Sequence, residues 1–141
     1  MLRVVLDTSV IVTALRSRDG ASFALLGAVR MRRVVPLATP TLFLEYEDVL
    51  KRPEQRKASG LSLDDVERFL GAFAVAIEPV EVHIRWRPQL RDPGDEMVFE
   101  AAINGGADAL VTYNVKDFRE AAPRFGLRVL RPAELLLEIM G

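Results

Sequence analysis

The chain has 141 residues, of which 50% are hydrophobic and 28% charged, with a net charge of −1 and no cysteine. This length and composition suit one globular domain over residues 1–141, with a hydrophobic core, rather than a disordered chain. The lack of cysteine excludes disulfides and thiolate metal sites, and the small net charge excludes a general electrostatic attraction to nucleic acid.

The N-terminal residues Met1-Leu2-Arg3 lead directly into a strand-like segment, without the hydrophobic region of a signal peptide. No apolar run of the sequence is long enough to cross a bilayer. We therefore expect a cytoplasmic protein with no membrane partner.

The first half of the chain alternates strand and helix patterns. Residues 2–6 (LRVVL) form a continuous apolar run that predicts a buried strand. Residues 33–38 (RVVPLA) predict a second strand, in which Pro36 indicates an irregular or edge position. Helices are predicted over residues 10–15, 22–31 and 41–50.

The second half continues this alternation. Ser62 with Asp65 forms a capping-box pattern that predicts the start of a helix, and residues 75–79 predict a third strand. The remaining predicted elements are a helix over residues 95–104, strands over 109–112 and 127–130, and a final helix over 132–140.

Strands that alternate with helices and are apolar on both faces predict an α/β fold with a mainly parallel central sheet. In such sheets ligands bind beyond the carboxyl ends of the strands, near the point where the strand order reverses. The residues that follow the first and fourth strands, Asp7-Thr8-Ser9 and Tyr113-Asn114, are therefore the first candidates for a site.

Asp7 has the strongest individual case, because it follows a buried strand and is followed by two hydroxyl residues, Thr8 and Ser9. Asp7 could instead cap the next helix, but three capping residues in a row exceed what one helix end needs. We favour a functional role for Asp7.

Asp95 begins the core-facing stripe of the helix predicted over residues 95–104, where an ionised carboxylate needs a partner. The alternative is helix capping, with Asp92 as the N-cap, Pro93 as the first helical residue and Asp95 as the acid at the third position. Capping by Asp92 does not exclude a metal role for Asp95.

Glu45 lies at the edge of the apolar face of the helix over residues 41–50, where an ordinary boundary glutamate is the alternative. Asp7, Glu45, Asp95 and Asn114 would converge at one edge of the sheet. Clustered carboxylates repel one another unless a cation or protons neutralise them. Oxygen ligands without histidine or cysteine suit Mg²⁺ or Mn²⁺.

Four segments resemble the PIN-domain family in order and spacing, and in particular its branch of toxin–antitoxin toxins related to VapC-type ribonucleases. They are LDTSV near the N-terminus, Glu45 in the helix leading to VLKRP, DPGDEMVFEAA from Asp92, and GADALVTYNVKDF from Gly106. Each motif alone is weak, but the ordered set is specific and spans nearly the whole chain. The resemblance implies a PIN-like, Rossmann-like fold with three α/β/α layers.

By this resemblance, Asp7, Glu45 and Asp95 match the first three acids of the family and would hold one or two Mg²⁺ or Mn²⁺ ions. Thr8 or Ser9 matches the small hydroxyl residue near the first acid. The catalytic set that the resemblance implies is Asp7, Glu45, Asp95 and Asn114.

Asn114 is a departure from the family, whose fourth acid commonly follows the VT of the fourth strand. An asparagine offers a carbonyl oxygen but no charge. Asp117, one turn further on, would contribute a carboxylate to the metal, or would cap a short helix that starts at Phe118. Asp92 and Glu96 are outer candidates.

The implied activity is a metal-dependent endoribonuclease, the toxin of a type II toxin–antitoxin system, which hydrolyses RNA phosphodiesters and leaves 5′-phosphate and 3′-hydroxyl ends. The implied partners are RNA, a cognate antitoxin protein, and further copies of the chain in a homodimer or higher oligomer. A second hypothesis stays open, in which a non-catalytic PIN-like module with a degraded metal site binds RNA or a protein.

Side chains near the acids are candidate contacts to RNA. They are Thr8, Ser9, Arg16 and Lys116. Other basic runs, at residues 30–33, 51–57 and 85–91, more often mark a solvated face than a nucleic-acid site.

Overall fold

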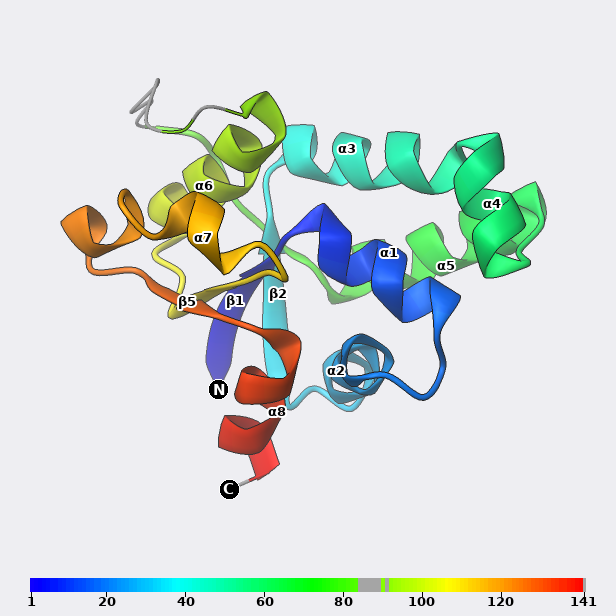
Figure 1. The fold of residues 1–141 in the computed structure, drawn as a ribbon, viewed down its shortest axis with the longest axis horizontal. Coiled ribbons are helices and arrows are strands. Elements are labelled where there is room, and N and C mark those ends of the chain that lie inside the picture. The colour runs from blue at the N-terminus through cyan, green and yellow to red at the C-terminus, as the bar shows by residue number, and fades with distance from the viewer. Residues whose placement is uncertain (84–89, 91, 141) are drawn as a thin grey trace.

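A five-stranded parallel sheet forms the centre of the computed structural model, which describes residues 1–83, 90 and 92–140 (Figure 1). The strand order is β3-β2-β1-β4-β5, and every neighbouring pair is parallel. The strands are β1 (Leu2–Leu6), β2 (Val34–Ala38), β3 (Glu78–Pro79), β4 (Ala109–Val111) and β5 (Arg128–Leu130). The predicted α/β fold with a parallel sheet is confirmed.

Helices flank this sheet on both sides. They are α1 (Thr8–Arg16), α2 (Ala21–Arg30), α3 (Pro40–Lys51), α4 (Pro53–Ser59), α5 (Leu63–Ala76), α6 (Pro93–Gly105), α7 (Val115–Phe118), a 3-10 helix η1 (Ala122–Phe125) and α8 (Pro132–Met140). Figure 1 shows α6 and α7 on one side of the sheet and α1, α2 and α5 on the other. None of the helices in the described part of the chain has the length and apolarity needed to cross a membrane.

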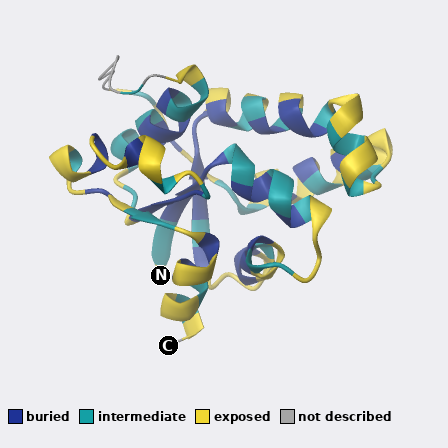
Figure 2. Ribbon diagram, in the orientation of Figure 1, coloured by how far each residue is buried: buried dark blue, intermediate teal, exposed yellow. Residues whose placement is uncertain are grey.

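The core lies along the central strands and the inward faces of the helices, as Figure 2 shows by its buried residues. In β1 the side chains of Val4, Val5 and Leu6 are fully buried, and in β4 those of Leu110 and Val111 are as well. Strands covered on both faces have continuous apolar runs, which explains why the sequence pattern locates these two strands.

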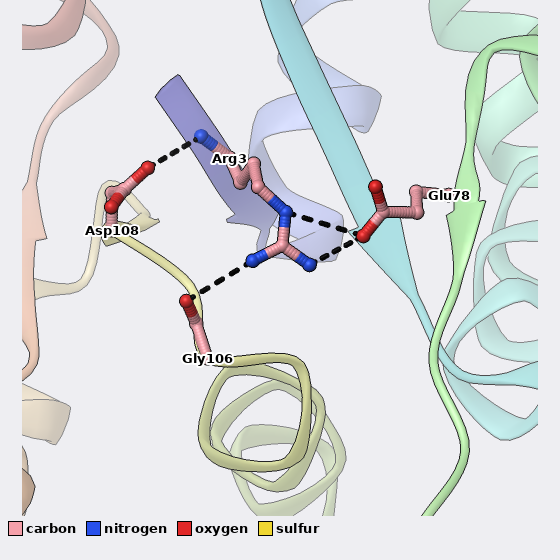
Figure 3. A network of polar contacts seen from close by, with 4 residues as sticks. All are labelled: Arg3, Glu78, Gly106 and Asp108. Atoms are coloured by element: carbon pink, nitrogen blue, oxygen red, sulfur yellow. Dashed lines mark hydrogen bonds and ion pairs between the residues drawn. The ribbon is translucent and has the colours of Figure 1, made fainter. Parts of the chain in front are cut away.

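Arg3 of β1 aligns the neighbouring strands (Figure 3). Its main-chain N–H donates to Asp108 Oδ2 at 2.8 Å, and the Asp108 N–H donates to the Arg3 carbonyl at 2.7 Å. Its guanidinium donates to the Glu78 carboxylate of β3 and to the Gly106 carbonyl at the end of α6. These contacts hold β4 in register with β1, so the residues that follow the two strands lie at the same edge of the sheet.

Two strand predictions need correction. The strand predicted over residues 75–79 is wrong in its first part, because α5 continues to Ala76 and leaves only Glu78 and Pro79 for β3. Pro36 does not lie on an edge strand, since β2 pairs with both β1 and β3. The pairing with β3 involves only Leu37 and Ala38, so a proline without an N–H is tolerated beside it.

Helix α4 is an element that the sequence analysis does not predict. It begins with Pro53 at its first position and ends at Gly60, whose φ of 76° is the left-handed conformation that glycine adopts readily. The capping box at the start of α5 is confirmed, because Ser62 accepts from the Asp65 N–H and Asp65 accepts from the Ser62 N–H.

Candidate functional site

The strand order places the switch point of the sheet between β1 and β4. From the central strand β1, the chain first builds β2 and β3 on one side and later adds β4 and β5 on the other. Asp7 follows β1 and Thr112 follows β4, so these two residues meet where ligands of open parallel sheets bind. This location agrees with the sequence prediction.

Asp7 occupies the N-cap position of α1, but its side chain makes no capping hydrogen bond. The carboxylate is only 7% exposed, and its Oδ2 accepts from Ser9 Oγ at 2.9 Å and from Thr112 Oγ1 at 2.6 Å. Both hydrogen bonds from the described residues use Oδ2, which leaves Oδ1 for another ligand. Helix capping therefore does not explain Asp7.

Thr112 connects Asp7 to Asn114. The Asn114 N–H donates to Thr112 Oγ1 at 2.9 Å, and the Thr112 hydroxyl donates to Asp7. The Asn114 side chain is exposed and makes no capping bond, although Asn114 is the N-cap of α7. Position 114 thus supports Asp7 through its main-chain amide, which is present whatever the side chain is.

Asp117 lies inside α7, which spans Val115–Phe118, so the predicted helix start at Phe118 with Asp117 as its cap is wrong. Its N–H donates to the Asn114 carbonyl at 3.0 Å, which keeps Asp117 one turn beyond the end of β4. The side chain is exposed at this position.

The start of α6 brings in the third acid. Asp92 is the N-cap, with Oδ1 accepting from the N–H groups of Gly94 at 2.7 Å and Asp95 at 3.3 Å, and Pro93 is the first helical residue. The capping role of Asp92 is confirmed. Glu96 is 6% exposed and accepts from the Leu90 N–H at 2.6 Å, so this outer candidate holds the chain that enters α6.

Four aspartates influence one another at this edge. The pKa of Asp95 is raised to about 7, first by burial and then by the charges of Asp7, Asp92 and Asp117 and a hydrogen bond with Asp117. Burial and neighbouring carboxylate charges both disfavour the ionised form of a carboxyl group. The structure thus brings Asp7, Asp92, Asp95 and Asp117 close enough to interact.

Glu45 lies on α3, half-buried, and is not among the groups that raise the pKa of Asp95. Its charge instead adds to that of Asp48 in raising the pKa of Arg52. Its neighbour Tyr46 donates a hydrogen bond to the Leu6 carbonyl, and burial and the charge of Asp7 raise the pKa of this tyrosine. The helix that carries Glu45 is therefore joined to the site, while a metal role for Glu45 stays a prediction.

The family model described as the PIN domain matches residues 3–116 of this sequence. The chain belongs to the PIN-domain family. A chain in the crystal structure of VapBC2 from Rickettsia felis bound to a DNA fragment from their promoter is similar to this PIN domain. The TM-score is 0.59 and the identity 16%, over 92% of this chain and 98% of that chain, which shows a shared fold. No curated protein sequence matches this PIN domain.

The donor set of this PIN domain suits a divalent metal ion. Among the described residues no group of three or more histidine, aspartate or glutamate side chains already has the spacing to hold a metal. The four aspartates nevertheless offer only oxygen ligands, and their repulsion is relieved by a cation. Mg²⁺ keeps several waters and needs only one or two carboxylates, so the set fits this ion without a closed cage.

The predicted RNA contacts stay predictions. Ser9 is engaged with Asp7, whereas Thr8 is half-buried at the start of α1. Arg16 is exposed at the end of α1 and donates to Gln55 Oε1 at 2.5 Å, and Lys116 is exposed on α7. The basic run at residues 85–91 falls, except for Leu90, outside the described residues.

Two residues that hold Asp7 and its peptide in place, Thr112 and Tyr46, were not predicted from the sequence. Thr112 is fully buried yet polar, and its position directly after a buried strand is a signal that was available. Tyr46 belongs to the apolar stripe of α3, and nothing in that stripe distinguishes a tyrosine whose hydroxyl bonds to Leu6 from one that only fills the core.

Proposed function

We propose that this PIN domain is a metal-dependent endoribonuclease that hydrolyses RNA phosphodiester bonds, acting as the toxin of a type II toxin–antitoxin pair. One observation carries the proposal: in a PIN-domain fold, Asp95 lies beside Asp7, Asp92 and Asp117, and burial together with their charges raises its pKa to about 7. A structural cluster of this kind at a switch point is expected of a site that binds a cation.

The proposed ligands of Mg²⁺ or Mn²⁺ are Asp7, Glu45 and Asp95, with Asp117 as a further candidate. Such an ion supplies a Lewis acid that polarises a phosphoryl oxygen and lowers the pKa of water. Asp7 presents its carboxylate in a fixed direction, because Ser9 and Thr112 both hold Oδ2.

Asp95 is the acid whose charge most needs a cation. Burial and the charges of neighbouring aspartates raise its pKa to about 7 without a cation, so a bound Mg²⁺ or Mn²⁺ would hold it ionised as a ligand. Arg16, at the end of α1, and Lys116, on α7, are both exposed and would contact the phosphate backbone of RNA.

An antitoxin partner is supported by the similar fold in the VapBC2 complex from Rickettsia felis and by an apolar groove of about 970 Å³. The groove lies between α2, α5 and β2 and includes Phe23, Leu26, Phe69, Val75, Arg30 and Arg32. We propose that an amphipathic antitoxin segment lays its apolar face in this groove, and that acidic residues of this segment meet the two arginines.

Two features of the groove favour a protein partner. Phe23 is 42% exposed and Val75 is 89% exposed, so apolar surface faces solvent there. Within the described part of the chain, Arg30 and Arg32 form no salt bridge. The two positive charges also disfavour pairing of this groove with its own copy, so a homodimer or higher oligomer would use another face.

A non-catalytic binding module is the second candidate, and two observations favour it. Asn114 stands where the family commonly has an acid, and the described carboxylates do not form a preformed metal cage. In this case the PIN domain would bind RNA or a protein without cleaving it.

A titration with Mn²⁺ separates the two candidates. The nuclease requires saturable Mn²⁺ binding together with RNA cleavage that stops when EDTA is added and returns when Mn²⁺ is restored. RNA binding without turnover at saturating Mn²⁺ would instead establish the binding module.

A further inference from the structure

Tyr46 is a buried core residue whose hydroxyl group is not required to fill the core. The side chain is 1% exposed, and its ring packs against Phe43 and Phe73 at centroid distances of 6.4 and 6.0 Å. A phenylalanine would fill the same space without burying a polar group, which costs free energy unless it forms a hydrogen bond. The hydroxyl therefore serves its partner, the Leu6 carbonyl.

That partner is the carbonyl of the peptide that joins Leu6 to Asp7. The N–H of the same peptide donates to the Val111 carbonyl of β4 at 2.9 Å. The register between β1 and β2 ends at Val5 and Leu37, one residue earlier. Tyr46 thus bonds to β1 at the point where pairing with β2 ends, and it holds the peptide plane from the side opposite to β4.

A peptide plane held at both its N–H and its carbonyl has little freedom to rotate, and this plane sets the direction in which the Asp7 side chain leaves the chain. The Asp7 carboxylate is then fixed a second time, by Ser9 and Thr112. Tyr46 comes from a different element than these two hydroxyls, since it lies on α3 next to Glu45.

We propose that Tyr46 is a positioning residue, which locks the Leu6–Asp7 peptide to α3 and thereby sets the separation between the carboxylates of Asp7 and Glu45. This role rests on the proposed function, because it matters only if both acids approach one cation. Mg²⁺ and Mn²⁺ sites depend on geometry, so a looser link between β1 and α3 weakens binding of the ion even when both ligands are present.

The chain offers a matched control for this role. Thr39, the N-cap of the same helix, is also buried, and its Oγ1 accepts the Leu42 N–H at 3.1 Å without contacting the Leu6–Asp7 peptide. Tyr46→Phe and Thr39→Val each remove one buried hydroxyl and leave most of the side chain in place, so both variants are expected to fold.

The test measures the Mn²⁺ dissociation constant by calorimetry, at a temperature where thermal unfolding shows both variants fully folded. We expect about tenfold weaker binding for Tyr46→Phe, and the wild-type constant for Thr39→Val. A Tyr46→Phe protein with wild-type affinity overturns the positioning role but leaves the proposed function standing, whereas a wild-type protein that binds no Mn²⁺ overturns both.

A double-mutant cycle with Glu45→Gln shows whether Tyr46 acts through the paired acids. In a positioning role, Tyr46→Phe weakens Mn²⁺ binding much less when Glu45 is already replaced, because there is no longer a separation to maintain. If Tyr46→Phe reduced the Mn²⁺ affinity equally with and without Glu45, Tyr46 would not act through the separation between Asp7 and Glu45.

Discussion

The Thr112 hydroxyl donates a 2.6 Å hydrogen bond to Oδ2 of Asp7, which lies 105 residues earlier in the chain. The same hydroxyl accepts the Asn114 N–H at 2.9 Å. Thr112 therefore converts the register between β4 and β1 into a fixed orientation of the Asp7 carboxylate, and it joins the segment after β4 to that carboxylate.

Thr112→Val is expected to loosen this arrangement, because the Asn114 N–H and Asp7 Oδ2 each lose a partner. We expect a loss of about 1–3 kcal/mol in the free energy of unfolding, and Mn²⁺ binding about tenfold weaker. Thr112→Ser, which keeps the hydroxyl, should restore the affinity.

Thr39→Val is the control for Thr112→Val. Thr39 is also buried, and its Oγ1 accepts the Leu42 N–H at 3.1 Å, but it does not contact a carboxylate. It should lose about 1 kcal/mol of stability as a helix cap without a change in Mn²⁺ affinity. If Thr112→Val and Thr39→Val changed the Mn²⁺ affinity equally, the hydrogen bond from Thr112 to Asp7 would not matter for metal binding.

Asn114→Asp tests whether the site lacks a charge. The main-chain N–H that bonds to Thr112 is kept, so stability should change by less than about 0.5 kcal/mol. A further carboxylate, three residues before Asp117, should tighten Mg²⁺ binding several-fold, as calorimetry would show. Unchanged affinity would mean that the side chain at position 114 faces away from the cation and that only its amide matters.

Because the pKa of Asp95 is raised, the stability of the folded protein should depend on pH. In the unfolded chain this carboxyl has an ordinary pKa of 3.8, whereas in the folded protein the pKa is about 7, so the folded state holds the proton more tightly. In EDTA, the contribution of Asp95 to stability is therefore full below about pH 4, declines as the pH rises towards 7, and stays low above it.

Thermal unfolding of wild type and Asp95→Asn at pH 5 and pH 8 isolates this contribution, because the asparagine has no proton to lose. The wild-type protein should lose stability relative to the variant between these pH values. In addition, Asp92→Asn and Asp117→Asn should each lower the pKa of Asp95, measured by carbon NMR of the carboxyl group. A pKa of Asp95 near 4 in the wild-type protein would remove the basis for the proposed cluster.

Val75→Asp probes the apolar groove. Because Val75 is 89% exposed, the free energy of unfolding should stay within about 0.5 kcal/mol of wild type. The charge should nevertheless weaken binding to the proposed antitoxin at least about tenfold, because it places a carboxylate against an apolar face.

Leu137→Asp on α8 is the control for the groove, since this leucine is 73% exposed and does not line it. It should bind the partner like the wild-type protein. If Val75→Asp and Leu137→Asp weaken the complex equally, the antitoxin does not bind in this groove.

The sequence predicts the elements whose pattern is local. Continuous apolar runs locate β1 and β4, and capping residues such as Ser62 and Asp92 mark the helix starts where the structure has them. It predicts β3 poorly, because two paired residues after a long helix leave no strand pattern.

The proximity of Asp7 to Asp95 was predictable from the position of Asp7 after a strand and of Asp95 on the core-facing stripe of a helix. Their supports were not, because the contact from Thr112 to Asp7 and the contact from Tyr46 to Leu6 depend on the register of the sheet and the packing of α3. Asp117 illustrates the same limit, since its place inside α7 follows from where β4 ends.

Cleavage of an end-labelled RNA by the purified PIN domain, with Mn²⁺ and then with EDTA, tests the central claim most directly when wild type is compared with Asp7→Asn. This substitution keeps the size of the side chain and removes the charge of the first acid. We expect cleavage by the wild-type protein that EDTA abolishes, products with 5′-phosphates, and no cleavage by a folded Asp7→Asn protein. Equal cleavage by the two proteins, or cleavage that persists in EDTA, would contradict it.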